Sequence, residues 1–327
     1  MKEQANQFII EVDRRIDAVL NPTLTSDEPT RPSDGSSLWK AAHHTCHAGG
    51  KRVRPRLVRY FGDIVDCDVD AMADIAVTAE LIHAASLVHD DVIDTATTRR
   101  GHTTVNAEWN NITAVLSGDL MFSLAFANLQ RFPKPVMVSA TRVLKEMSCA
   151  VIDEFEARGN LDLSEAAWRE IARGKTGALF AWCGIGPALE RGNTELAQRF
   201  DEVGNHFGVA FQLADDIQDV LPGGDKDRFA DLKNQNPSYL TLAAVKKDAE
   251  LRKAIESAWN DNTFSDWESL GERVIEVALA DAANVLRSEV ESGLALLDDY
   301  AHTDGVAALA EWSREKLGAY FRGAKAA

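Results

Sequence analysis

The chain has 327 residues, of which 45% are hydrophobic and 26% charged, so it is long enough for one large or two average globular domains. Its 35 basic and 51 acidic residues give a net charge of −16, which argues against nucleic acid or an anionic membrane surface as the main partner. The four cysteines are scattered without a Cys-x-x-Cys pair, a distribution typical of reduced thiols.

The beginning of the chain has no apolar core of the kind found in signal peptides. No run of apolar residues reaches the ~20 that a membrane span needs, and the longest candidate, residues 177–189, is too short. We therefore expect a cytoplasmic protein without a transmembrane segment.

Apolar residues recur at helical spacing over residues 3–20, and the proline-rich stretch 21–37 predicts an exposed loop. Residues 56–132 and 238–327 contain no proline and are rich in helix formers at a spacing of 3.6, while sustained alternation of period two is absent. The sequence predicts an all-α, single-domain helical bundle over residues 1–327. Helix breaks are expected near Gly101, Pro133, Gly159, Gly192, Pro222 and Pro237.

The pattern Asp-Asp-x-x-Asp occurs twice, at residues 90–94 and 215–219, each time at the end of an apolar run. On a helix, residues four apart share a face, and two carboxylates about 6 Å apart repel by roughly 3 kcal/mol at an effective dielectric near 20. Oxygen ligands suit Mg²⁺ or Mn²⁺, and Mg²⁺ is usually bound by carboxylates together with substrate phosphates. One such motif could be a solvated helix end, but two of them, expected on facing helices of the bundle, indicate a phosphorylated substrate.

Basic residues occur near both motifs. Residues 51–56 contain four cations, Arg99 and Arg100 follow the first motif, and Lys175 lies in a Gly-Lys-Thr-Gly sequence. Each group alone could be a solvated turn. Beside two metal-type acidic motifs they become candidates for binding phosphate, arginine through bidentate hydrogen bonds and lysine as a point charge.

Three short patterns resemble other sites and fail on closer reading. Residues 174–176 resemble the end of a P-loop but lack the earlier glycine and a preceding strand. Residues 66–77 begin like an EF-hand loop but lack its glycine and its final glutamate. The third pattern comprises the possible transition-metal ligands His43, His44, Cys46 and His47. Because no second pair of metal ligands lies nearby in the sequence, we interpret it as ordinary helix surface.

Taken together, the motifs resemble those of the trans-isoprenyl diphosphate synthases, or polyprenyl synthetases, over residues 49–242. The resemblance is carried by Gly-Lys-Arg-Val-Arg-Pro at 50–55, Ile-His at 82–83, the two acidic motifs, Arg-Arg-Gly at 99–101, Gly-Asp at 118–119, Lys-Thr-Gly at 175–177 and Phe-Gln at 211–212. It implies the isoprenoid synthase fold around a central cavity, about three Mg²⁺ ions (with Mn²⁺ as an alternative) and a homodimer.

The resemblance also implies roles for individual residues. The metal ligands would be Asp90, Asp94, Asp215 and Asp219. Of these, Asp219 would act through water or by positioning, as would Asp91 and Asp216. An allylic diphosphate (dimethylallyl, geranyl or farnesyl) would be bound by Arg99, Lys175, Thr176 and Gln212. Isopentenyl diphosphate would be bound by Lys51, Arg54, His83 and Arg100. The residues expected to act in catalysis are Asp90, Asp91, Asp94, Lys175, Asp215 and Asp216.

The implied reaction begins when metal ions and cationic side chains stabilise the charge on the departing diphosphate, so that the allylic C–O bond breaks. A water-poor apolar cavity protects the resulting carbocation. The isopentenyl double bond then attacks it, and a proton is lost.

Product length is expected to depend on the residues four, five and eight positions before the first motif, which are Ser86, Ala85 and Ile82. One helical turn rises about 5.4 Å, roughly one isoprene unit. Short-chain members of the family resemble one another in placing bulky aromatics at the fourth or fifth position. The small residues here therefore predict a product longer than C15, with Phe122 and Phe126 either as a lower floor of the pocket or as ordinary core residues.

The sequence departs from the family pattern after the second motif, where the usual Asp-Leu-x-x-Gly-Lys-x-Thr-Leu-Pro is replaced by residues 231–240 with Asn236 in place of lysine. Lys226 or Lys233 could supply the missing charge, and the frequent basic terminus is also lacking. Two alternatives stay open: a terpene cyclase on the same fold, and a non-catalytic subunit of a heteromeric synthase. The cyclase form of the second motif fails at Asp219 and Gly223, and a non-catalytic subunit would be expected to lose one motif.

Overall fold

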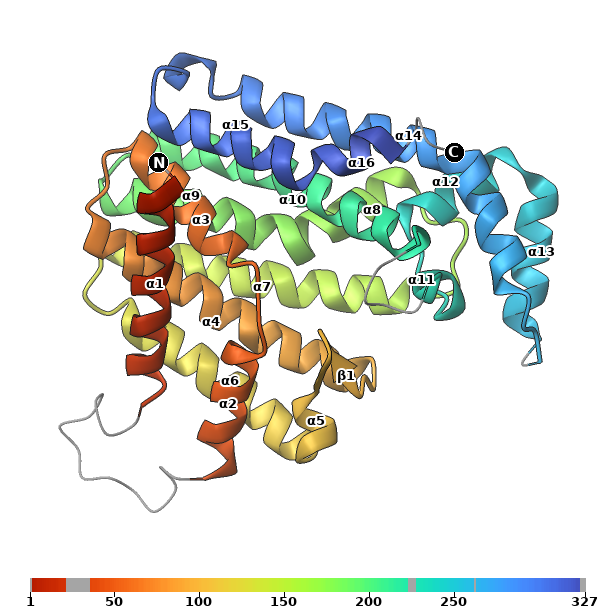
Figure 1. Cartoon of the computed structure of the whole chain (residues 1–327), viewed down its shortest axis with the longest axis horizontal. Helices are drawn as coiled ribbons and strands as arrows, with labels where there is room; N and C mark the ends of the chain where they lie inside the picture. Colours follow the sequence, from red (N-terminus) through yellow and green to blue (C-terminus); the bar gives the residue numbers. More distant parts are fainter. Residues whose placement is uncertain (1, 22–35, 223–227, 262, 324–327) are drawn as a thin grey trace. The chain divides into compact units, whose positions relative to one another are not determined.

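A computed structural model describes residues 2–21, 36–222, 228–261 and 263–323 (Figure 1). The chain divides into two compact units, which are described separately. Unit 1 comprises Met1–Thr141, Trp182–Phe200 and Thr303–Ala308, and unit 2 comprises Arg142–Ala181, Asp201–His302 and Leu309–Ala327. The predicted loop at 21–37 falls mostly outside the described residues, and the single-domain prediction stays a prediction.

The described residues are mainly helical, which confirms the predicted fold class. In chain order, the first ten elements of the described residues are α1 (Lys2–Val19), α2 (Ser37–His47), α3 (Val53–Ile64), α4 (Val69–Ile93), β1 (Thr98–Arg99), β2 (His102–Thr103), α5 (Val105–Glu108), α6 (Asn111–Asn128), α7 (Lys134–Glu156) and α8 (Glu165–Ala172). The following elements are the π-turn η1 (Arg173–Gly177), α9 (Ala178–Glu190), α10 (Thr194–Val220), α11 (Ala230–Lys233), α12 (Tyr239–Lys247), α13 (Ala249–Asn260), α14 (Trp267–Ala295), the 3₁₀ turn η2 (Asp298–Tyr300), α15 (Asp304–Lys316) and α16 (Gly318–Gly323).

The predicted breaks near Pro133, Gly159, Gly192 and Pro237 fall between helices. The break near Gly101 is a tight antiparallel hairpin, which the sequence did not predict. In it Thr98 pairs with Thr103, and Arg100 and Gly101 both adopt positive φ, as a type I′ turn requires.

Two local details go beyond the sequence-based expectations. Pro187 lies inside α9, which continues to Glu190 although proline usually ends or kinks a helix. A break at residues 65–68 was not predicted, and there the Asp68 carboxylate accepts hydrogen bonds from the backbone N–H groups of Asp70 (3.0 Å) and Ala71 (3.1 Å). Asp68, one of the aspartates in the EF-hand-like pattern at residues 66–77, is thus the N-cap of α4.

The core of unit 1 is built around α4, whose apolar residues are buried on most sides, from Met72 to Val88. Among the described residues, α4 is the one helix long and apolar enough to cross a membrane by length and composition, but 78% of its apolar window is buried inside the protein, as expected for a core helix. Helix α6 packs closely on α4 (Figure 1) because Gly118 has no side chain: a Cβ there would lie 2.2 Å from His89 Nε2.

The core of unit 2 holds α10 against the π-turn η1 and against α14. A Cβ on Gly208 of α10 would lie 2.1 Å from the Cα of Gly177, so glycine permits this close backbone approach. The buried carboxylate of Glu289 on α14 contacts His206 Nδ1 of α10 at 2.7 Å and also contacts Arg169 of α8. These contacts fix the helices that carry Lys175 and the second acidic motif.

Candidate active site

The first acidic motif lies at the C-terminal end of α4. Asp90 and Asp91 belong to the last turn, and Asp94 follows the last helical residue. The backbone N–H of Asp94 still donates to the carbonyl of Asp90 at 2.8 Å. The expected separation of one helical turn between Asp90 and Asp94 is therefore present.

The three carboxylates of this motif differ in exposure. Asp94 is exposed and Asp90 half-buried, whereas Asp91 is buried and accepts a hydrogen bond from Arg99 Nε at 2.8 Å. Burial raises the pKa of Asp91, with a further contribution from Asp94, and the Arg99 guanidinium opposes both. Asp91 thus joins the end of α4 to strand β1, while Asp90 and Asp94 remain accessible to a ligand.

The second motif likewise lies at the C-terminal end of its helix, α10. Asp215 is exposed, whereas Asp216 and Asp219 are buried. Asp216 accepts hydrogen bonds from the backbone N–H of Tyr239 (2.8 Å) and from Gln212 Nε2 (3.1 Å). Burial raises the pKa of Asp216 well above its usual range, and the neighbouring Asp231 and Asp215 add to this effect.

Asp219 anchors the chain segment after the motif. Its carboxylate accepts hydrogen bonds from the backbone N–H groups of Ala230 (3.1 Å) and Asp231 (3.3 Å), the first residues of α11. Asp219 therefore satisfies donors at the start of a helix. This arrangement agrees with the positioning role that the resemblance implies for Asp219.

A helix C-terminus carries a partial negative charge, so carboxylates there are disfavoured, and a cation there is favoured by ~0.3–1 kcal/mol. Both motifs place carboxylates at this end. The accessible residues Asp90, Asp94 and Asp215 offer only oxygen ligands, the donor type that Mg²⁺ and Mn²⁺ prefer. The residues present thus fit a divalent metal ion, although they belong to different units, and the expectation that the motifs face one another stays a prediction.

Unit 1 brings together residues expected to bind isopentenyl diphosphate. The guanidinium of Arg100 donates to the carbonyl of Gly49, which joins the hairpin turn to the loop before α3. Burial lowers the pKa of His83 well below its usual range, and the charges of Arg54 and Arg100 lower it further. His83 is therefore neutral near pH 7, within range of several arginines that favour an anionic ligand.

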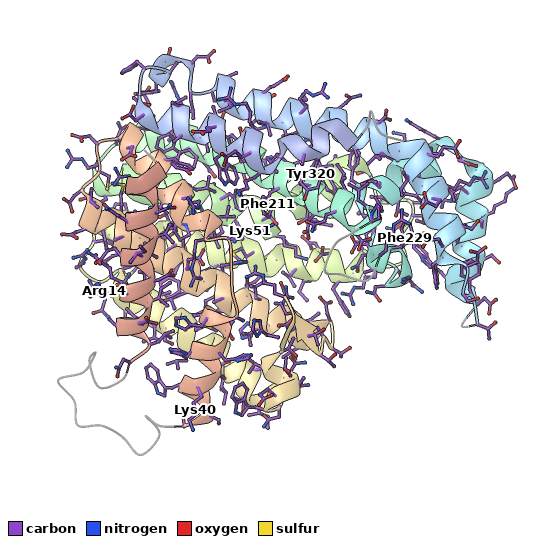
Figure 2. The ribbon with its side chains drawn as sticks, viewed as in Figure 1. Arg14, Lys40, Lys51, Phe211, Phe229 and Tyr320 are labelled. Atoms are coloured by element: carbon purple, nitrogen blue, oxygen red, sulfur yellow. The ribbon has the colours of Figure 1, made fainter. Side chains whose placement is uncertain are left out.

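Two further cations of the segment 51–56, Lys51 and Arg52, have different surroundings. Lys51 is exposed in the loop between α2 and α3 (Figure 2). Arg52 donates to Asp13 (2.7 Å), to Glu80 (3.0 Å) and to the carbonyl of Cys46 (3.0 Å). Arg52 thus connects α1, α2 and α4, a structural role that the sequence analysis did not assign.

In unit 2, Lys175 and Thr176 belong to η1, where the helix adds a residue to one turn, a feature frequent at functional sites. Lys175 Nζ contacts Glu154 of α7, a residue that the sequence analysis missed. Thr176 Oγ1 donates to Gln212 Oε1 at 3.1 Å, and the amide nitrogen of Gln212 donates to Asp216. Gln212 thus links η1 to the buried carboxylate of the second motif.

The segment that departs from the family pattern is well fixed in unit 2. Gln235, at the usual glycine position, adopts φ 61°, and its carbonyl accepts from the Gly159 N–H at 2.8 Å. Asn236 donates to Asp231 Oδ1 at 3.2 Å, and its own Oδ1 is buried without a hydrogen-bond partner among the described residues. Lys226 lies outside the described residues, and Lys233 is half-buried on α11.

The predicted chain-length residues fall into two groups. Ile82 and Ala85 are completely buried in unit 1. Ser86 is half-buried and lies three residues after His83 and four before Asp90, so these three residues share one face of α4. On α6, Phe122 and Phe126 are half-buried. The ring centroid of Phe122 lies 5.7 Å from that of His89.

Tyr320 is another residue near the second motif that the sequence analysis missed. It lies on α16 (Figure 2), and its hydroxyl donates to Gln218 Oε1 at 3.2 Å. Burial raises the pKa of Tyr320, and the charge of Asp215 adds to the shift. More than 100 residues separate Tyr320 from the motif, so no local sequence signal could have identified this contact.

A family model described as "Polyprenyl synthetase" matches residues 36–276. The chain is 30% identical over 264 residues to heptaprenyl diphosphate synthase component 2 of Bacillus subtilis (strain 168), covering 78% of this chain and 75% of the relative. A decaprenyl diphosphate synthase from Rhodobacter capsulatus has the same fold, with a TM-score of 0.86 at 23% identity over 98% of this chain and 99% of that one. A polyprenyl synthase from Caulobacter crescentus CB15, solved with calcium and isoprenyl diphosphate, gives a TM-score of 0.81 at 25% identity over 99% and 98%.

We predict that His83 makes the protein less stable in mild acid. Because the folded-state pKa lies well below the unfolded value near 6.5, the unfolded state binds more protons between these two values, and stability rises with pH there. Relative to His83→Asn, the wild type should lose up to about 1.4 kcal/mol of unfolding free energy for each pH unit below about 6.5. Urea denaturation at a series of pH values measures this difference.

His302→Asn serves as the control, because His302 is exposed. Its stability should follow that of the wild type at every pH. Parallel pH profiles for the wild type and His83→Asn would contradict the prediction.

Proposed function

This chain belongs to the polyprenyl synthetase family and is a prenyltransferase, and we propose that it condenses isopentenyl diphosphate with an allylic diphosphate to give a product longer than C15. The observation that carries the proposal is the pattern of exposure within the two acidic motifs. Each motif buries its second carboxylate, Asp91 or Asp216, in hydrogen bonds and leaves its first, Asp90 or Asp215, accessible. This pattern suits metal-assisted binding of a diphosphate.

Mg²⁺ is the proposed cofactor, with about three ions for each active site and Mn²⁺ as a substitute. When bound, it would stabilise negative charge on the departing diphosphate. Asp90, Asp94 and Asp215 are the proposed direct ligands, with Asp219 as a further ligand through water. The calcium and isoprenyl diphosphate in the Caulobacter crescentus structure support a divalent ion and a diphosphate ligand here.

Arg99, Lys175, Thr176 and Gln212 are proposed to bind the allylic diphosphate, whether dimethylallyl, geranyl or farnesyl. All four make protein contacts: Arg99 with Asp91, Lys175 with Glu154, and Thr176 with Gln212, which in turn donates to Asp216. Such fixed donors need little reorganisation as charge develops on the leaving group. Lys175 has three N–H donors, so its ammonium can keep the contact with Glu154 and also bind a phosphate oxygen.

Isopentenyl diphosphate is proposed to bind in unit 1, to Lys51, Arg54, His83 and Arg100. The proposal is supported by the lowered pKa of His83, to which the charges of Arg54 and Arg100 both contribute. Neutral His83 can donate one hydrogen bond to a phosphate oxygen, while the arginines supply the positive charge.

A product longer than C15 is proposed from the small side chains on α4. Ser86 shares a face with Asp90 and is half-buried, so it can border the path of a growing isoprenoid tail. Ala85 and Ile82 are completely buried, so their size limits how large a side chain α4 can accommodate at these positions. The floor of this path is proposed to be formed by Phe122 and Phe126.

A homodimer is proposed from an apolar strip on α6. Ile112 is 73% exposed, Val115 42% and Leu116 50%, and the three share the outer face of the helix. Adjacent large apolar side chains at such exposure often mark an interface. We also infer a cytoplasmic location from the four free cysteines, and a single polyprenyl synthetase domain from a family match that includes parts of both units.

Incubation of the purified protein with Mg²⁺, farnesyl diphosphate and labelled isopentenyl diphosphate should give elongated diphosphates. Asp90→Asn and Asp215→Asn should each lower the rate by roughly 10²-fold or more, as does loss of a charge-stabilising group in other enzymes. Glu195→Gln, an exposed acid at the start of α10, is the control and should keep the wild-type rate. A hydrocarbon formed without isopentenyl diphosphate would indicate the cyclase alternative, and no product at all would indicate the non-catalytic subunit.

Replacing Ser86 or Ala85 by phenylalanine should shorten the product, because an aromatic ring at either position blocks the path along α4. Ser86→Phe is the sharper variant, since Ser86 is half-buried and its replacement overpacks the core less. Ser257→Phe, at an exposed position of α13, controls for the added ring. Products are sized by mass spectrometry, and an unchanged distribution in both variants would exclude the pocket argument.

Leu116→Glu should shift the protein from dimer to monomer in light scattering coupled to gel filtration, because the carboxylate would be buried in the proposed interface. Ile10→Glu provides the matched control, since Ile10 is 68% exposed on α1. The interface is wrongly assigned if Leu116→Glu keeps the dimer, or if the control dissociates equally.

A further inference from the structure

Two histidines of α2 and one aspartate of α1 form a compact group on unit 1, remote in sequence from both acidic motifs. His47 Nε2 lies 2.7 Å from Asp17 Oδ1, and His43 Nε2 lies 4.0 Å from the same oxygen. The two imidazole rings are 4.1 Å apart between centroids. Their potential ligand atoms all lie within 4.8 Å of one another.

This geometry is that of a metal-binding group. His43 and His47 are four residues apart on α2, so both side chains project from the same face. Ligands at 2.0–2.2 Å from a tetrahedral Zn²⁺ are separated from one another by roughly 3.3–3.6 Å. The distances of 2.7 and 4.0 Å bracket this spacing, and small side-chain rotations would bring all three atoms to it.

Of the four possible ligands noted in the sequence of α2, only His43 and His47 belong to this group, because His44 and Cys46 have other surroundings. His44 Nε2 instead contacts the carbonyl of Thr103 at 2.8 Å. Cys46 is buried with its Sγ 3.8 Å from Met121 Sδ, and burial raises the pKa of its thiol to about 12. The third residue of the group, Asp17, belongs to α1 and lies 26 residues before His43, so local spacing in the sequence could not identify it.

We propose that Asp17, His43 and His47 bind a first-row transition-metal ion, in the first place Zn²⁺, and that this ion ties α1 to α2. Two imidazoles and a carboxylate suit Zn²⁺, Cu²⁺ or Co²⁺, whereas the oxygen-only acidic motifs suit Mg²⁺. Burial, with the neighbouring His47, lowers the pKa of His43, which favours the neutral form that metal binding requires. Three protein ligands leave a fourth position for water.

The proposed ion would strengthen a connection that the protein already makes. Arg52 bonds Asp13, one helical turn before Asp17, and also bonds the carbonyl of Cys46, the residue before His47. The metal ion and Arg52 would thus hold the same two helices next to each other (Figure 1). The site would be structural, and it is followed in the chain by the loop with Lys51 and then by α3, which carries Arg54.

The test uses the full-length protein in excess Mg²⁺, so that the acidic motifs are occupied, with Cu²⁺ as the probe. Coordination by imidazole gives nitrogen hyperfine splitting in the electron paramagnetic resonance spectrum, which carboxylate ligands cannot produce. The wild type should show this splitting at one equivalent of Cu²⁺. His43→Ala and His47→Ala should each reduce the splitting to that of a single imidazole, whereas His44→Ala and His102→Ala should keep the wild-type pattern.

Isothermal titration with Zn²⁺ under the same conditions gives the affinity. Removal of any one ligand, including Asp17→Asn, should weaken Zn²⁺ binding by at least about tenfold, and Zn²⁺ should raise the melting temperature of the wild type but not of His47→Ala. Melting curves without metal establish that the variants fold, and His47→Gln replaces His47→Ala if the latter does not. The proposal is overturned if copper binds without nitrogen splitting, or if Zn²⁺ affinity is unchanged in Asp17→Asn and His47→Ala.

Discussion

The structure depends on carboxylates held at the negatively charged ends of two long helices. Helix α4 ends at Ile93 and α10 at Val220, so each acidic motif lies where the backbone carbonyls already disfavour negative charge. Arg99 partly compensates the first motif, and backbone N–H groups of α11 and α12 partly compensate the second. The more accessible carboxylates, Asp90, Asp94 and Asp215, offer oxygen atoms of the kind that divalent cations prefer as ligands.

The two buried aspartates Asp91 and Asp216 hold the chain segments next to each motif. Asp91 holds the hairpin that carries Arg99 and Arg100, and Asp216 holds the start of α12 and the side chain of Gln212. In both motifs the second carboxylate thus orients the next functional segment of the chain. A protein with a net charge of −16 needs such local order to offer arginines to a diphosphate, because its overall field repels anions.

Helical periodicity and the distribution of proline were sufficient to predict the fold class and most helix breaks, and the repeated acidic motif predicted the residues at the helix ends. The failures have specific physical causes. The hairpin at 98–103 was not predicted because it depends on positive φ at Arg100 and Gly101 rather than on strand periodicity. Contacts between distant segments, such as Tyr320 with Gln218, depend on tertiary packing and leave no trace in local spacing.

The departure from the family pattern at residues 235–236 changes the charge near the second acidic motif. Gln235 adopts a left-handed conformation that glycine adopts more easily, and the Gly159 N–H hydrogen bond helps to hold it there. The neighbouring Asn236 gives Asp231 a hydrogen bond but no positive charge, while Asp231 contributes to the raised pKa of Asp216. A lysine at this position would lower the negative potential around the second motif. With asparagine at this position, the surroundings of Asp216 stay more negative than they would be beside a lysine, which agrees with the raised pKa of Asp216.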